Sequence, residues 1–123
     1  MLLNDFYTIE QWASSTTTAG EASAVLVLNP DHAIFAGHFP GEPVVPGACL
    51  LQIVEELLSH ILETDYRLVN ARQIKFLTPI DPRRHPRIEA VLQYTLDGPF
   101  EVSAALSAAG TTFLKITGIF RAE

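Results

Sequence analysis

Cysteine is nearly absent from this sequence, and long apolar runs are missing altogether. The only cysteine among the 123 residues is Cys49, which excludes an intrachain disulfide, and no histidine has metal-ligand spacing to it. No run of about 18 apolar residues occurs to span a membrane, and the first residues, 1–6, lack the basic and apolar regions of a leader. We therefore expect a single cytoplasmic domain with no metal site and no membrane insertion.

Basic residues are also few. Eight Lys and Arg against fourteen Asp and Glu give a net charge of −6, which disfavours nucleic-acid binding, because a basic face supplies most of that affinity. Six of the eight basic residues nevertheless fall between positions 67 and 87, where Asp81 is the only acid. They are Arg67, Arg72, Lys75, Arg83, Arg84 and Arg87. The sequence therefore predicts one basic strip on an acidic protein.

One helix stands among several strands in the hydrophobic pattern. Residues 46–63 alternate apolar and polar positions at helical spacing, and Pro46 suits the first turn. The polar stripe of this helix comprises Gln52, Glu55, Glu56, Ser59, His60 and Glu63. Strands are predicted at 22–28, 87–96, 100–108 and 111–121. The pattern indicates an α+β domain with an antiparallel sheet laid against or around the helix, and its exposed strand edges favour a dimer.

The segment 35–52 carries the candidate chemistry. It holds three prolines and three glycines around a single histidine, His38, and then enters the helix. Such a loop is stiff, and the unpaired N–H groups of a helix N-terminus at Gly47 are suited to polarising a carbonyl oxygen. His38 is placed to act as a base beside that carbonyl. The alternative is a structural turn in which His38 only caps or packs.

The motif in residues 37–47, Gly-His-Phe-Pro-Gly-x-Pro-Val-x-Pro-Gly, resembles the signature of the β-hydroxyacyl-acyl carrier protein dehydratases. The resemblance implies a single hot-dog domain over 1–123, with the sheet wrapped around one long central helix. It also implies dehydration of a (3R)-hydroxyacyl thioester to the trans-2-enoyl thioester, in fatty-acid or specialised lipid or polyketide-like synthesis. The substrate would be carried on the phosphopantetheine of an acyl carrier protein, with no other cofactor. His38 would be the base, and the amide of Gly47 would bind the thioester carbonyl.

The sequence departs from that family at Gln52. The family has a glutamate or aspartate at this position, and it serves the active site of the other subunit. A glutamine orients a hydroxyl but has no usable proton to donate. Three explanations stay open: His38 serves both proton transfers while Gln52 orients the hydroxyl, Glu56 acts through water, or a partner subunit supplies the acid. On the polar stripe, however, Glu55 and Glu56 are expected to be solvated.

Two further groups of residues are candidates for binding. The acyl channel is expected to be lined by Phe39, Val44, Val45 and Phe76, although core packing explains each of them as well. The contact with an acidic carrier protein or its phosphopantetheine phosphate is expected from Arg83, Arg84 and Arg87, whose alternative is a solvated loop. Cys49 is expected to be buried rather than reactive.

Three functions remain open from the sequence. The first is a dehydratase that acts with an acyl carrier protein, as a homodimer or as a heterodimer with a dehydratase homologue. The second is a catalytically deficient subunit that pairs with a homologue bearing the acid. The third is a hot-dog thioesterase, which would need a water-activating acid at another position.

Overall fold

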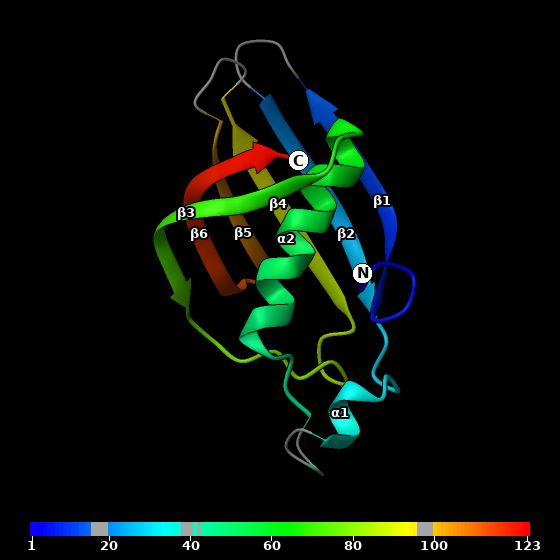
Figure 1. The fold of residues 1–123 in the computed structure, drawn as a ribbon. Coiled ribbons are helices and arrows are strands. Elements are labelled where there is room, and N and C mark those ends of the chain that lie inside the picture. The colour runs from blue at the N-terminus through cyan, green and yellow to red at the C-terminus, as the bar shows by residue number, and fades with distance from the viewer. Residues whose placement is uncertain (16–19, 38–40, 42, 96–99) are drawn as a thin grey trace.

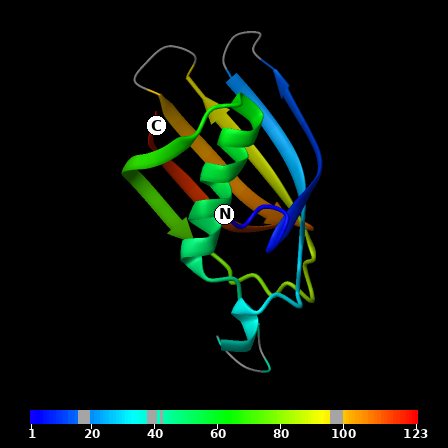
Figure 2. The same cartoon turned by 45° about the vertical axis from the view of Figure 1, so that its right-hand side comes forward.

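A curved antiparallel sheet surrounds one long helix, α2 (Gly47–Leu62), in the computed structural model of the protein (Figure 1, Figure 2). The structure describes residues 1–15, 20–37, 41, 43–95 and 100–123. A short helix, α1 (Ile34–Gly37), precedes α2. The strands are β1 (Tyr7–Ser15), β2 (Gly20–Leu28), β3 (Tyr66–Phe76), β4 (Arg87–Tyr94), β5 (Glu101–Ala108) and β6 (Thr111–Ala122). Within the described part of the chain, no helix is long and apolar enough to cross a bilayer.

The six strands form one sheet in the order β1-β2-β4-β5-β6-β3, and all neighbours are antiparallel. The hairpin between β5 and β6 turns at Ala109 and Gly110, which both have positive φ. This arrangement confirms the predicted α+β architecture of an antiparallel sheet wrapped around a central helix. Strands β1 and β3 were not predicted, and they form the two edges of the sheet.

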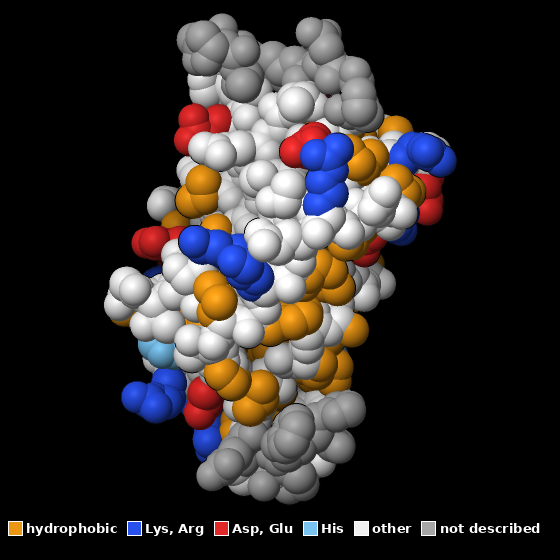
Figure 3. All heavy atoms as spheres, turned by 90° about the vertical axis from the view of Figure 1, so that its left-hand side faces the viewer, with side chains coloured by type: hydrophobic (Ala, Val, Ile, Leu, Met, Phe, Trp, Pro, Cys, Tyr) orange, Lys and Arg blue, Asp and Glu red, His pale blue; other side chains and the backbone are white. Residues whose placement is uncertain are grey.

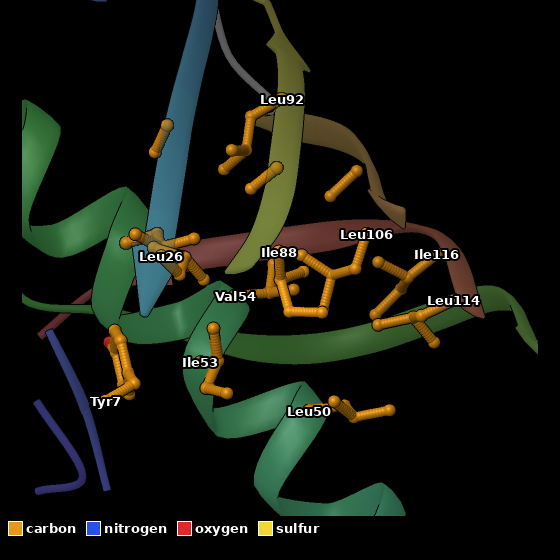
Figure 4. Close-up of a cluster of buried hydrophobic side chains, with 14 of the residues drawn as sticks. Tyr7, Leu26, Leu50, Ile53, Val54, Ile88, Leu92, Leu106, Leu114 and Ile116 are labelled. Atoms are coloured by element: carbon orange, nitrogen blue, oxygen red, sulfur yellow. The ribbon is translucent and has the colours of Figure 1, made fainter. Parts of the chain in front are cut away.

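The core lies between α2 and the concave face of the sheet. Strands β4 and β5 bury every second residue, as their alternating sequences require. The helix contributes Leu50, Ile53 and Val54, which point toward side chains of the central strands (Figure 4). Those strand residues include Leu26, Ile88, Leu92, Leu106, Leu114 and Ile116. Burial of apolar side chains from both the helix and the sheet therefore fixes α2 in place. The helix directly follows residues 37–46, which we call the motif loop.

Strand β3 meets β6 through two register shifts, one between Leu68 and Asn70 and one between Ala71 and Gln73. Gly118 of β6 lies at this irregular pairing. A Cβ atom added at Gly118 would lie 2.7 Å from the backbone oxygen of Asn70. Because backbone cannot yield as a flexible side chain does, the close approach of the two strands requires glycine here.

We expect Gly118→Ala to destabilise the fold by about 1–3 kcal/mol, because the added methyl group overpacks the junction of β3 and β6. Urea denaturation measures the change in the free energy of unfolding. The control is Lys115→Ala on the exposed face of the same strand, which should change that free energy by less than about 0.5 kcal/mol. Equal stability of Gly118→Ala and the wild type would contradict the tight approach.

Candidate active site

The N-terminus of α2 presents backbone donors without a side-chain cap. The helix begins at Gly47, and the preceding Pro46 is extended, with φ −60° and ψ 142°, and makes no capping hydrogen bond. The carbonyl oxygen of Pro46 instead accepts the N–H groups of Cys49 and Leu50, at 3.0 and 3.3 Å. The first N–H groups of a helix have no acceptor within it, so Gly47 offers the donor that carbonyl binding needs.

Phe76 packs against this helix start. A Cβ atom added at Gly47 would lie 3.1 Å from two carbon atoms of the Phe76 ring. The structure therefore brings together two predicted site residues that are far apart in the sequence. The Phe76 side chain remains 55% exposed, so it forms a partly open apolar wall beside Gly47.

The other predicted acyl-channel residues differ in burial. Val45 is only 4% exposed, and its N–H donates to the carbonyl oxygen of Ile80 at 2.9 Å, so it anchors the loop to the core. Val44 is half-buried. The predicted base His38 and the predicted channel residue Phe39 lie outside the described residues. Their roles stay predictions that rest on the motif.

Arg83 tethers the motif loop to the segment before β4. One of its Nη atoms donates to the carbonyl oxygen of Gly41 at 3.2 Å, and its backbone N–H donates to Asp81 Oδ1 at 2.9 Å. Partial burial raises the pKa of Asp81, but the hydrogen bonds from Arg83 outweigh it and bring that pKa below its ordinary value. The guanidinium of Arg83 thus stabilises the local structure, in addition to any contact with a carrier protein.

The predicted basic strip is divided in the fold. Strands β3 and β4, which hold most of its residues, are not neighbours in the sheet. Several of its charges also have acidic partners. Arg87 makes two 2.9 Å hydrogen bonds to the carboxylate of Glu10, and Arg72 lies 3.0 Å from Glu101. Separate Lys and Arg side chains are visible from the side of β3 and β6, with hydrophobic side chains between them (Figure 3).

The polar stripe of α2 is not simply solvated, and the expectation for its two central glutamates is wrong. Glu56 is only 9% exposed, because the first residues of the chain fold back over it. Glu55 is half-buried and accepts the N–H of Leu68 in β3 at 2.9 Å. Both carboxylates therefore connect α2 to other elements of the fold. Their exposure depends on residues distant in sequence, so helical periodicity alone did not reveal it.

Four donors surround the carboxylate of Glu56. The backbone N–H groups of Leu2 and Leu3 donate to its two oxygens, each at 2.8 Å. The Tyr7 hydroxyl donates to Oε1 at 3.0 Å, and Gln52 Nε2 donates to Oε2 at 2.8 Å. The pKa of Tyr7 lies well above its ordinary value. Burial of the Tyr7 hydroxyl is the largest cause, followed by the charge of Glu56 and the hydrogen bond between the two side chains. A carboxylate with both oxygens accepting is an anchor, so this geometry does not favour Glu56 as a proton donor.

Gln52 lies at the edge of a groove of about 490 Å³. The groove is lined by Gln52, Glu55, Glu56 and His60 of α2, by Leu3 and by Arg67. Most of its lining residues are polar or charged, although about half of its lining surface is apolar, and the groove is open to solvent. Gln52 is therefore accessible from the groove, although Nε2 of its side chain donates to Glu56.

The remaining reactive side chains do not form a second site. Cys49 is buried, and burial raises the pKa of its thiol, as expected for a packing residue. Among the residues that the structure describes, no group of three or more His, Cys, Asp and Glu is arranged to hold a metal ion.

The sequence model of one protein family, described as ApeI-like (ApeI dehydratase), matches residues 14–111. No curated protein matches the sequence significantly.

Three solved structures share the fold. An uncharacterized protein from Erwinia carotovora subsp. atroseptica is 21% identical, with a TM-score of 0.74, over 94% of this chain and 96% of that one. The dehydratase heterocomplex ApeI:P from Xenorhabdus doucetiae gives 19% identity and a TM-score of 0.68, over 91% and 95%. A candidate thioesterase, yhdA from Lactococcus lactis, gives 15% and 0.66, over 93% and 91%. At these identities the likeness establishes the fold and not the reaction.

We expect Arg83→Met to loosen the motif loop, because the substitution removes the donor to Gly41. Amide hydrogen exchange at Val45 should become roughly fivefold faster, as the loss of one hydrogen bond implies. The control is Arg84→Met, since the Arg84 guanidinium has no partner among the described residues. Equal exchange at Val45 in the wild type and Arg83→Met would show that Arg83 does not hold the loop.

Proposed function

Because this chain belongs to the ApeI-like dehydratase family, we propose that it dehydrates a 3-hydroxyacyl thioester, carried on an acyl carrier protein in the cytoplasm, to the trans-2-enoyl thioester. The observation that carries the proposal is the uncapped start of α2 at Gly47, directly after the motif loop and against Phe76. A backbone donor at this point suits an oxygen on which negative charge develops when the α-proton is removed. Phe76 would contact the acyl chain.

His38 is assigned as the general base because of its position in the motif. In the proposed reaction it takes the α-proton, the thioester carbonyl oxygen gains negative charge, and the N–H of Gly47 stabilises that charge. The C–O bond at the β-carbon then breaks, and the hydroxyl leaves as water with the proton that His38 returns. Glu56 is occupied by four donors, which favours this use of a single base over a proton from Glu56.

A second subunit is part of the proposal. Strand β3 is a free edge of the sheet, and its neighbourhood exposes three large apolar side chains, Val69, Phe76 and Leu77, each about half exposed. An exposed apolar edge strand is suited to pairing with another copy or with a homologue. The groove beside Gln52 would then face the partner's reacting group.

The second candidate is a subunit that completes its site with a homologue bearing the acid. The observation in its favour is Gln52 itself, which cannot donate the proton of a carboxylic acid. The dehydratase ApeI:P, which shares this fold, is a heterocomplex. A thioesterase, the third candidate, shares the fold through yhdA but would need an acid that activates water.

We expect the wild-type protein to convert 3-hydroxyacyl-carrier protein into the enoyl product, detected by mass spectrometry. His38→Ala should lower the rate by about 10²- to 10⁴-fold, the usual contribution of a general base. Gln52→Glu should not increase the rate, because the new carboxylate would lack the amide donor of Gln52 and would lie against the carboxylate of Glu56. Release of free carrier thiol without enoyl product would instead indicate the thioesterase.

The same assay separates the first two candidates. A wild type that becomes active only on addition of an acid-bearing homologue, or only as Gln52→Glu, would indicate the deficient subunit. Full activity of His38→Ala would contradict the dehydratase mechanism itself.

Among the predicted carrier-binding residues, Arg83 and Arg87 pair with Asp81 and Glu10, whereas Arg84 has no acidic partner among the described residues. We expect Arg84→Glu to lower kcat/KM for the carrier-bound substrate about five- to tenfold, since it weakens electrostatic steering of an acidic partner. A pantetheine thioester of the same acid should react at an unchanged rate. The control is Arg121→Glu, the same change at an exposed arginine near the end of β6. Equal effects of both substitutions would show that only net charge matters.

A further inference from the structure

The side chain of Gln52 has a defined orientation, because its neighbour can only accept hydrogen bonds. Gln52 and Glu56 lie one helical turn apart, and the 2.8 Å contact joins Nε2 of Gln52 to Oε2 of Glu56. A carboxylate offers no donor to an amide oxygen, so the reversed amide would place two acceptors together. Since the amide group is planar, its Oε1 atom is turned away from Glu56.

We propose that Glu56 is a positioning residue that holds Gln52 with its carbonyl oxygen presented to the reacting group, so that Gln52 acts as a hydrogen-bond acceptor at the family's acid position. This inference rests on the proposed dehydratase function for its catalytic meaning. The orientation of the Gln52 amide can be tested without any reaction.

Glu56 is itself held firmly enough for this task. Its other contacts are the backbone N–H groups of Leu2 and Leu3 and the hydroxyl of Tyr7, which is 1% exposed. Two of these three donors belong to the backbone and cannot rotate away. The N-terminal residues and β1 therefore fix the position of the carboxylate. The hydrogen bond that Gln52 donates to this carboxylate holds the Gln52 side chain in turn.

The orientation gives Gln52 a specific role in the proposed reaction. The O–H group of the 3-hydroxyl donates to Oε1 of Gln52, which leaves an oxygen lone pair of the hydroxyl free to accept a proton. The proton that His38 removed from the α-carbon is transferred to that lone pair as the C–O bond breaks. The electron pair of the C–H bond forms the double bond, water leaves, and His38 ends neutral as it began.

The first test uses selective ¹⁵N labelling of glutamine side chains and NMR spectroscopy. The chain has four glutamines, and Gln52→Met identifies the Gln52 signal by its loss. In the wild type, one Nε2 proton should be shifted downfield and should exchange slowly with water. A Gln52 signal at the position and exchange rate of a free side-chain amide would overturn the proposal, and this result needs no variant of Glu56.

The second test compares two identical chemical changes on adjacent residues. Glu56→Gln removes the charge and leaves one acceptor oxygen where the carboxylate has two, so the downfield Gln52 signal should disappear. Glu55→Gln is the matched control, because the Glu55 carboxylate accepts the N–H of Leu68, whereas the Gln52 amide donates to Glu56. Loss of the signal in both variants, or in neither, would overturn the assignment of Glu56 as the positioning residue.

Kinetics then test the catalytic meaning. Glu56→Gln should lower kcat about tenfold with little change in KM, because the acceptor is needed as the hydroxyl leaves. Glu55→Gln should keep kcat within about twofold. Equal falls in kcat for the two variants would contradict the catalytic role. A wild type that shows the held Gln52 signal but forms no enoyl product would remove the proposed function while supporting the orientation.

Discussion

The buried carboxylate of Glu56 is the constraint on which the described site depends. Taking a charge out of water is unfavourable unless it is hydrogen-bonded, and the four donors around Glu56 meet that requirement. Those donors come from the N-terminal residues, β1 and α2. One side chain therefore links the start of the chain, an edge of the sheet and Gln52. Removal of the whole carboxylate group would leave all four donors without this acceptor.

The other half of the site is organised by packing and by a short loop. Phe76 lies against Gly47, so the end of an edge strand borders the start of the central helix. Arg83 holds the carbonyl of Gly41, and Val45 is tied to Ile80, so the motif loop is attached to the segment before β4 at two points. These contacts pre-organise backbone groups near Gly47, which is what stabilisation of a developing negative charge requires.

Much of this structure could be predicted from the sequence, and the failures have physical causes. Four strands and the helix were predicted because their apolar residues recur at the spacing of a strand or of a helix. The edge strands β1 and β3 were missed, since many of their residues are exposed on both faces and show no such alternation. Gly47 and Gln52 were proposed as site residues from the family resemblance, and their roles stay predictions. The burial of Glu56 was not predicted, because it is created by Leu2 and Leu3, more than fifty residues away.

Leu2, Leu3 and Gln52 share one buried acceptor, the carboxylate of Glu56. Amide hydrogen exchange of Leu2 and Leu3 in the wild-type protein, followed by NMR spectroscopy, measures whether these hydrogen bonds exist, because chain termini are normally unprotected. Both amides should exchange at least about tenfold more slowly than in an unstructured peptide of the same sequence. Exchange at the unstructured rate would show that the N-terminal residues do not bind Glu56.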